Sequence, residues 1–220
     1  MSSHHIVRDD QEPALIIANG ASCNQELLGQ LLEWSPLVIV LDSAIERVID
    51  LNIKVDVVLG DFDRGFDPHE FLKSQYPIEI IHAPDQNKTD LEKAFDYLIE
   101  RKIPAVNVVW ATGKRADHTI TNLTNIIRYR DLLKIVILDD HSKVFVLPKK
   151  FEKWYPANTP ISLIPVGEVT GIHSENLFYP LRNDSLTIGY RTGSSNHVTK
   201  DGIVKIQHED GNLLMMECVD

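Results

Sequence analysis

The apolar residues of the first 150 positions fall into short runs that are separated by amphipathic stretches. The runs have the length and composition of buried strands and lie at residues 14–18, 37–41, 55–59, 78–81, 106–110, 134–138 and 144–147. Stretches that suit helices lie between them, at 24–34, 45–49, 68–74, 90–99 and 119–129. Strands that are apolar on both faces and alternate with helices are typical of a mainly parallel sheet covered on both sides. The pattern therefore predicts a doubly wound α/β domain over residues 1–150.

The pattern changes near residue 150, where short β-rich segments replace the alternation of strands and helices. These segments are split by Gly, Asn and Asp and lie at residues 161–166, 177–181, 186–190, 203–207 and 213–217. Asp201-Gly202 and Asp210-Gly211 are dipeptides typical of hairpin turns. The pattern predicts a small antiparallel β-sandwich domain over residues 151–220, with a linker around residues 149–160.

Two carboxylates, Asp61 and Asp63, follow the third predicted strand within Gly60-Asp61-Phe62-Asp63-Arg64. Carboxylate oxygens suit Mg²⁺, which usually takes one or two protein carboxylates beside substrate phosphates and water. Aspartate also favours turns, so a solvated turn is an equal alternative for this pair taken alone.

The helix predicted after residue 89 has a well-defined start. Thr89 and Glu92 fit a capping box, in which each side chain bonds the backbone of the other residue. Asp90 at the first helical position is favoured by the helix dipole alone. The functional alternative is that the helix N-terminus faces a phosphate while Asp90 holds the bridging metal. Lys88 suits a phosphate contact and equally suits solvent.

Polar residues follow six successive strands of the predicted α/β domain. They are Asn19-Gly20, Asp42, Asp61 with Asp63, the stretch 85–90, the stretch 113–118, and Asp139-Asp140. In open α/β sheets the ligand crevice lies outside the carboxyl ends of the strands. We therefore expect these residues to share one site.

The stretch 113–118 combines a glycine with charged side chains. Gly113 permits close backbone approach, and Lys114 and Arg115 are cations that suit phosphate. Asp117 also suits a cap of the following helix, and His118 also suits simple packing. Acids gathered at one site repel one another without a cation, and the acids in question are Asp61, Asp63, Asp85, Asp90 and Asp117. Bound Mg²⁺ with nearby Lys and Arg favours phosphoryl-type transfer.

Composition narrows the range of partners and ligands. The net charge of −10 disfavours a nucleic-acid backbone as a partner, and neither G-x-x-x-x-G-K-[ST] nor G-x-G-x-x-G occurs. Cys23 and Cys218 lie far apart without zinc spacing, which predicts thiols in a reducing compartment. No apolar run approaches the ~18 residues of a membrane span, and the first residues are polar. We expect a soluble, cytoplasmic protein.

Five motifs, taken in order, resemble the thiamine pyrophosphokinase family. They are N-G-A at 19–21, G-D-F-D at 60–63, D-Q-N-K-T-D-L-E-K-A at 85–94, T-G-K-R-A-D-H-T-I-T-N-L at 112–123 and S-S-N at 194–196. The resemblance implies an α/β nucleotide domain followed by a β-sandwich. It implies Mg²⁺-dependent transfer of the pyrophosphoryl group of ATP to thiamine, which yields thiamine diphosphate and AMP. It also implies a homodimer with thiamine bound between subunits.

The resemblance assigns roles to individual residues. The carboxylates that would hold Mg²⁺ are Asp61, Asp63 and Asp90, and they form the predicted catalytic set with Arg115 and Asp117. The phosphates and the reacting hydroxyl would contact Gln86, Thr89, Lys93, Arg115 and Asp117. The other predicted ATP contacts are Asn19, Gly20, Asp42, Lys88, Gly113, Lys114 and His118. Thiamine would face Tyr179, Ser195 and Asn196, although an aromatic residue such as Tyr179 in a strand more often belongs to a core.

The chain departs from the family pattern at several positions. Arg64 stands where Ser is usual, and Asp42-Ser43-Ala44 replaces Asp-Gly-Gly. Trp110 and Lys114 stand where glycines are common. Two other function classes stay open: a D-x-D nucleotide-sugar transferase, and a regulator that binds nucleotide or thiamine without turnover. The first would not require the R-x-D-H and S-S-N motifs, and the retained acids speak against the second.

Overall fold

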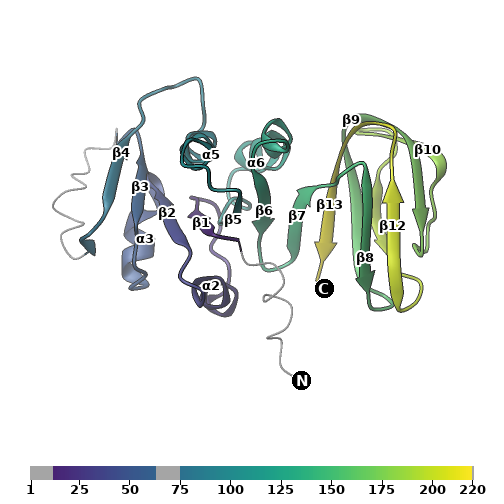
Figure 1. The fold of residues 1–220 in the computed structure, drawn as a ribbon, viewed down its shortest axis with the longest axis horizontal. Coiled ribbons are helices and arrows are strands. Elements are labelled where there is room, and N and C mark those ends of the chain that lie inside the picture. The colour runs from purple at the N-terminus through teal and green to yellow at the C-terminus, as the bar shows by residue number, and fades with distance from the viewer. Residues whose placement is uncertain (1–11, 63–74, 220) are drawn as a thin grey trace. The chain divides into compact units, whose positions relative to one another are not determined.

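The computed structural model of the protein describes residues 12–62 and 75–219 and forms two compact units, divided between Asp139 and Asp140. Figure 1 shows the helices and strands of each unit. Asp63, Arg64 and the helix predicted at 68–74 lie outside the described residues.

The described part of the first unit holds a parallel sheet. Its strands are β1 (Ala14–Ile17), β2 (Leu37–Leu41), β3 (Val57–Gly60), β4 (Glu79–His82), β5 (Ala105–Val109) and β6 (Lys134–Leu138). They lie in the order β4-β3-β2-β1-β5-β6, and every neighbouring pair is parallel. The chain adds β2, β3 and β4 on one side of β1 and then crosses to place β5 and β6 on the other. The strand order therefore reverses between β1 and β5, where open α/β sheets bind their ligands.

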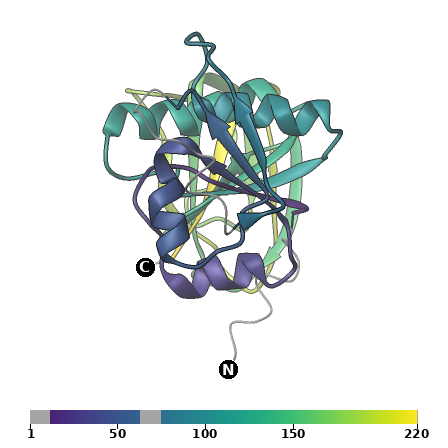
Figure 2. The same ribbon diagram turned by 90° about the vertical axis from the view of Figure 1, so that its left-hand side faces the viewer.

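Helices cover both faces of this sheet. The short 3-10 turn η1 (Asp42–Ala44) leads into α3 (Ile45–Asp50), and α3 lies on the same face as α2 (Gln25–Leu32). The opposite face carries α5 (Asp90–Glu100) and α6 (Ala116–Tyr129), as Figures 1 and 2 both show. Leu28 of α2 and Val48 of α3 pack against buried strand residues such as Leu15. The doubly wound prediction is confirmed.

The two helices on the second face begin differently from one another. α5 has the predicted capping box between Thr89 and Glu92. α6 begins at Ala116 rather than at Thr119, and its Ile120 is 63% exposed. The inward face of α6 includes Ile126 and Tyr129 and continues toward the polar Asn122, which donates to the Ala111 carbonyl. Because Asn122 on this inward face is polar, the sequence pattern did not reveal the start of the helix correctly.

The second unit is an antiparallel β-sandwich. Its strands are β7 (Ser142–Val146), β8 (Lys150–Tyr155), β9 (Pro160–Glu175), β10 (Arg182–Thr187), β11 (Gly193–His197), β12 (Gly202–Gln207) and β13 (Asp210–Cys218). The first half of β9 pairs with β11 and β13, and its second half pairs with β10 and β12. Side chains such as Leu163, Ile172, Leu186 and Val204 form one shared core. The predicted sandwich is confirmed, and β7 belongs to it because β7 pairs with β13.

Several strand boundaries in the second unit differ from prediction. The expected linker contains β8, in which Phe151, Lys153 and Tyr155 face inward and are more buried than Lys150, Glu152 and Trp154. The stretch 177–181 forms only an isolated bridge, at Leu177, among the described residues. Neither Asp-Gly dipeptide closes a hairpin, because β12 pairs with β8 and β9 whereas β13 pairs with β7 and β9. Pairing between distant segments overrides these local turn signals.

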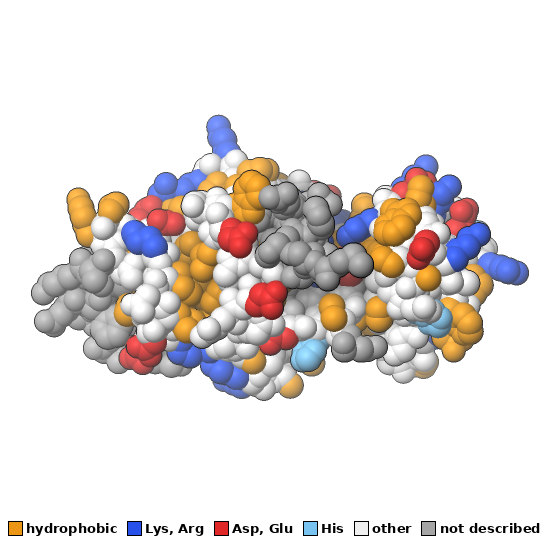
Figure 3. Space-filling view, turned by 90° about the horizontal axis from the view of Figure 1, so that it is seen from below, with side chains coloured by type: hydrophobic (Ala, Val, Ile, Leu, Met, Phe, Trp, Pro, Cys, Tyr) orange, Lys and Arg blue, Asp and Glu red, His pale blue; other side chains and the backbone are white. Residues whose placement is uncertain are grey.

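The surface carries both acidic and basic side chains. Acidic and basic side chains are interspersed on the face drawn in Figure 3, so charges of this face form small separate groups. Cys23 and Cys218 are thiols rather than disulfide partners, as predicted. Among the residues that the structure describes, no helix has both the length and the hydrophobicity needed to cross a membrane.

Candidate active site

A cavity of about 690 Å³ opens at the carboxyl ends of the strands in the first unit. Loops after β1, β2, β3 and β5 and the starts of α5 and α6 supply its walls. The predicted residues that line it are Asn19, Gly20, Asp42, Asp61, Thr89, Asp90, Gly113, Lys114, Arg115, Asp117 and His118. The sequence did not single out Ser43, Thr121 or Asn122, which also line it. Thr121 and Asn122 follow one helical turn after Asp117 and His118, a spacing that would have found them.

The Asp42 carboxylate is fixed by its neighbours. Its Oδ2 accepts a hydrogen bond from the Phe62 amide at 3.1 Å, and its Oδ1 accepts one from the Ser43 hydroxyl at 2.8 Å. A Cβ at Gly60 would come within 2.3 Å of the Asp42 Cγ, so only glycine allows β3 to approach this carboxylate so closely. The backbone after β3 therefore holds Asp42 beside Asp61.

Asp90 lies at the start of α5 and faces both of these acids. Burial raises the pKa of Asp90, Lys93 opposes that rise, and the charges of Asp42 and Asp61 add to it. The Lys93 ammonium donates to Asp90 Oδ1 at 2.9 Å and is itself buried. The Gln86 side-chain amide donates to Asp61 Oδ2 at 3.1 Å. The cavity therefore has an acidic wall whose charges repel one another.

This acidic wall fits a divalent cation in its chemistry. Mg²⁺ binds to proteins through one or two carboxylates and completes its shell with water and phosphate oxygens. Within residues 12–62 and 75–219, no group of three acidic, His or Cys side chains is close enough to bind one metal ion. Asp61 and Asp90 line the cavity together, whereas Asp63 lies outside the described residues.

The opposite wall carries cations. The Lys114 ammonium donates to the Asn19 carbonyl at 3.0 Å. Arg115 donates to Asp117 through Nε at 3.1 Å and through Nη2. This pairing with Arg115, aided by the backbone amide of His118, lowers the pKa of Asp117 to about 2. Asp117 is therefore a weak base that orients Arg115.

The loop after β1 and the loop after β5 are bonded together above the sheet. The Gly20 amide donates to the Trp110 carbonyl, and the Ala21 amide donates to the Thr112 carbonyl at 2.8 Å. A Cβ at Gly20 would lie 2.2 Å from the Thr112 oxygen, so the approach requires glycine. Trp110 and Lys114 have positive φ angles of 57° and 52°. The two departures noted at expected glycine positions therefore occupy left-handed backbone conformations.

Arg47 of α3 supports this junction, a role that no pattern in the sequence indicated. Its guanidinium donates to Asn19 Oδ1 at 2.9 Å, to the Ser22 hydroxyl at 2.9 Å and to the Gly20 carbonyl at 3.2 Å. Its Cζ also lies 4.4 Å from the centre of the Trp110 ring. In the sequence, Arg47 was one charged residue of an amphipathic helix.

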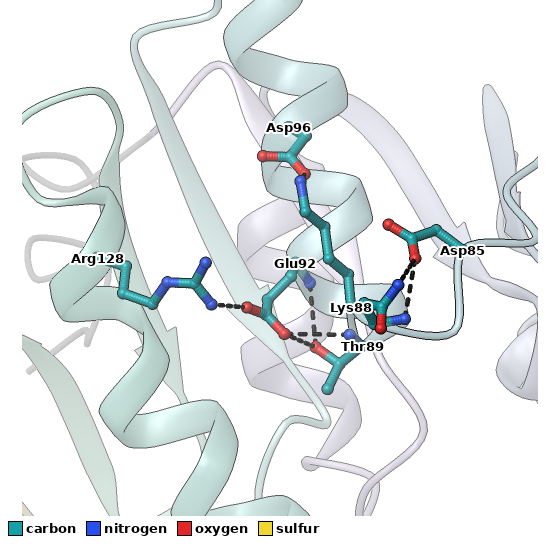
Figure 4. Close-up of polar contacts among 7 residues, drawn as sticks. Asp85, Lys88, Thr89, Glu92, Asp96 and Arg128 are labelled. Atoms are coloured by element: carbon teal, nitrogen blue, oxygen red, sulfur yellow. Dashed lines mark hydrogen bonds and ion pairs between the residues drawn. The ribbon is translucent and has the colours of Figure 1, made fainter.

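Two predicted residues take structural roles near the start of α5, as Figure 4 shows. Lys88 reaches along the helix to Asp96, with 2.7 Å between Nζ and Oδ2, and does not line the cavity. Asp85 accepts bonds from the amide and the side chain of Asn87, which is a turn contact. Lys88 is thus engaged by Asp96 and Asp85 by the turn before α5, and neither residue lines the cavity.

The candidate thiamine residues of the second unit differ in their exposure. Tyr179 is 62% exposed and packs edge-on against Phe178, which stacks on His197. Ser195 is exposed with a φ of 56°. Asn196 is buried, and its side chain accepts from the Tyr179 amide at 3.0 Å and donates to the Tyr179 carbonyl at 2.9 Å. Asn196 therefore supports the segment that presents the exposed aromatic ring.

Comparison with known proteins gives consistent matches along the chain. The family model described as "Thiamin pyrophosphokinase, catalytic domain" matches residues 28–137, and "Thiamin pyrophosphokinase, vitamin B1 binding domain" matches residues 148–213. A "Thiamin pyrophosphokinase 1" of Caenorhabditis elegans is 26% identical over 176 residues, which cover 73% of this chain and 71% of that protein. A "Thiamine pyrophosphokinase" of Bacillus subtilis is 26% identical over 174 residues, covering 74% and 78%.

Solved structures show the same fold. The crystal structure of the Bacillus subtilis thiamine pyrophosphokinase aligns with a TM-score of 0.78 and 24% identity, covering 94% of this chain and 99% of that one. The yeast enzyme structure aligns with a TM-score of 0.81 and 16% identity, covering 96% and 87%. Both likenesses extend through the parallel sheet and the antiparallel sandwich.

Proposed function

The chain belongs to the thiamin pyrophosphokinase family of enzymes, which carry out ATP-dependent pyrophosphorylation of thiamine, and we propose that it does so with Mg²⁺ held by Asp61, Asp63 and Asp90. One observation carries the proposal. At the point where the strand order reverses, a single cavity has Asp42, Asp61 and Asp90 on one wall and cations on the other.

The acidic wall supports the metal assignment. Asp61 and Asp90 border the same space, and part of the raised pKa of Asp90 comes from the charge of Asp61. A divalent cation would relieve that repulsion and, when bound, would neutralise phosphate charge. Asp63 is assigned to the metal by the family motif, and Lys93 orients the Asp90 carboxylate and opposes the rise of its pKa.

The cationic wall would receive the phosphates. Arg115, held by Asp117, offers a planar fork suited to phosphate oxygens, and Lys114 adds a second charge. In the proposed reaction, the hydroxyethyl oxygen of thiamine loses its proton to water and forms a bond to the β-phosphorus of ATP. The bond from that phosphorus to the α,β-bridging oxygen breaks, so AMP leaves. Such chemistry depends mostly on positioning and charge stabilisation, which agrees with the weak basicity of Asp117.

The exposed ring of Tyr179 would stack on the cationic ring system of thiamine. Ser195 would supply a hydroxyl to the same ligand, and Asn196 would hold the Tyr179 segment. We further propose a homodimer, which light scattering of the purified protein would detect as twice the mass of 24.9 kDa.

One assay tests the function. The protein is incubated with ATP, Mg²⁺ and thiamine, and the products are separated by chromatography. We expect AMP and thiamine diphosphate in equal amounts. Formation of ADP with thiamine monophosphate, turnover of a nucleotide sugar, or thiamine binding without any product would each refute the proposal and identify the class that replaces it.

A further inference from the structure

Arg47 and Trp110 stack on each other beside the loop that follows β1, and neither residue lines the cavity itself. The guanidinium lies over the indole ring at 4.4 Å and donates to Asn19, Gly20 and Ser22 in the loop that follows β1. Asn19 and Gly20 do line the cavity. A cation over an aromatic face is attracted by the negative ring face, most strongly where water is excluded.

Trp110 also contacts the same loop directly, through its backbone. Its carbonyl accepts from the Gly20 amide, and its side chain is 1% exposed among the core residues of the sheet. Its φ of 57° is a conformation that bulky L-residues rarely adopt. Because the ring is fixed in the core, the left-handed backbone of Trp110 places its face under Arg47.

Asn19 accepts hydrogen bonds from two cationic side chains. Its side-chain oxygen accepts from Arg47 at 2.9 Å, and its backbone carbonyl accepts from Lys114 at 3.0 Å. Burial lowers the pKa of Lys114 below its ordinary value, and the charge of Arg47 lowers it further. A shift of the loop would therefore move both the cavity wall and the Lys114 ammonium.

We propose that Arg47, stacked on Trp110, is a positioning residue that holds the Asn19-Gly20 wall ready for the nucleotide. It does not touch the reacting atoms. This role rests on the proposed function, because it names the nucleotide part of that same site. Its loss loosens the wall before the ligand arrives, and ligand binding must then restore the order. The effect therefore falls on KM for ATP and spares kcat.

The test compares Arg47→Met with Arg101→Met. Arg101 makes an equivalent stack, with Cζ 4.6 Å from the Tyr97 ring, and pairs with Glu79 away from the cavity. We expect Arg47→Met to raise KM for ATP about tenfold with kcat within about twofold, as a lost preorganising contact predicts. Arg47→Lys should recover part of the loss, because it keeps the charge over the ring. Arg101→Met should change neither constant.

Two measurements do not depend on turnover. Hydrogen exchange of the Gly20 and Ala21 amides should accelerate in Arg47→Met, while exchange of β2 and β6 stays unchanged. Binding of Mg²⁺–ATP, followed by calorimetry, should weaken by the same factor as KM rises. If the protein formed no thiamine diphosphate, the proposed function would fail while these two measurements would still decide the role of Arg47.

Three results would overturn the positioning role. The first is that Arg47→Met and Arg101→Met share the same KM for ATP and the same amide exchange. The second is a loss of kcat at unchanged KM, which would place Arg47 in the reaction itself. The third is faster exchange throughout the first unit, which would make Arg47 a general stabiliser.

Two variants of Trp110 give an independent test of the stack. Trp110→Phe keeps an aromatic face and should therefore change KM for ATP less than Trp110→Leu.

Discussion

Polar side chains have different uses in the two units. In the first unit, Asp42, Asp61 and Asp90 come from three different segments and face one cavity. In the second unit, Asn196 lies within β11 and gives its side-chain amide to the backbone of Tyr179. The carboxylates of the first unit therefore line a cavity, whereas the side-chain amide of Asn196 bonds the backbone of its own unit.

The difference follows from topology. All strands of a parallel sheet point the same way, so their carboxyl ends gather on one edge, where loops of separate origin meet. Antiparallel strands alternate in direction, so their carboxyl ends do not gather on one edge, and the buried Asn196 satisfies backbone groups of the neighbouring irregular segment instead. A polar motif is therefore stronger evidence for a ligand in the α/β unit than in the sandwich.

The largest test of this contrast is Asp90→Asn. Removing the charge should lower kcat by roughly 10³-fold, because metal-assisted charge stabilisation contributes several kcal/mol. The fold should survive, since an amide still accepts from Lys93. Asp96→Asn is the matched control on the same helix, where the partner is the solvent-exposed Lys88. Turnover near that of the wild type at saturating Mg²⁺ would exclude Asp90 from the metal site.

The complementary test in the second unit is Asn196→Ala. It leaves the Tyr179 amide and carbonyl without their partner, which should cost about 2 kcal/mol of unfolding free energy. Ser195→Ala, at an exposed neighbour, should change stability little. Urea unfolding measures both variants. Equal stabilities would mean that the Asn196 amide does not support the fold and is available for a ligand.

The fold class and most of the cavity could be predicted because both depend on local patterns. Apolar runs identified β1, β2, β5 and β6, and the parallel topology then placed residues such as Asp42 and Asp90 together. Side-chain direction could not be predicted in this way. Lys88 turns to Asp96 rather than to the cavity, and the contacts of Arg47 join segments that only the folded chain brings together.

The strand errors of the second unit have one cause. β8 carries alternating charges and pairs with β12, which lies some fifty residues later in the chain. The pairing partners of β12 and β13 are likewise distant, so a local Asp-Gly signal gave the wrong turn. Sandwich topology depends on such long-range pairs, and single-sequence patterns do not contain them.

A smaller effect concerns the backbone strain that borders the cavity. Lys114 has a φ of 52°, a conformation that costs an L-residue about 1 kcal/mol relative to glycine. Lys114→Gly and Lys114→Ala both remove the ammonium, but only glycine relieves the strain. The glycine variant should therefore be about 1 kcal/mol more stable than the alanine variant in urea unfolding, while both bind Mg²⁺–ATP equally weakly. Equal stabilities would show that the loop relaxes around the side chain.

The smallest expected effect is a loss of stability at acid pH that arises in the second unit and leaves the cavity of the first unit unaffected. His208 of the second unit is 6% exposed, and burial, followed by the charge of Lys149, lowers its pKa below the ordinary value of 6.5. The unfolded chain therefore takes up a proton more readily than the folded chain. The contribution of His208 to the free energy of unfolding is therefore complete above about pH 6.5 and is lost as the pH falls below that value.

Differential scanning calorimetry at pH 7.5 and 5.0 should show a larger decrease in Tm for the wild type than for His208→Gln, which cannot take up this proton. Because His208 lies in the sandwich and not at the cavity, His208→Gln should leave KM for ATP unchanged at pH 7.5. An equal decrease in Tm for both proteins would place the acid sensitivity elsewhere in the chain.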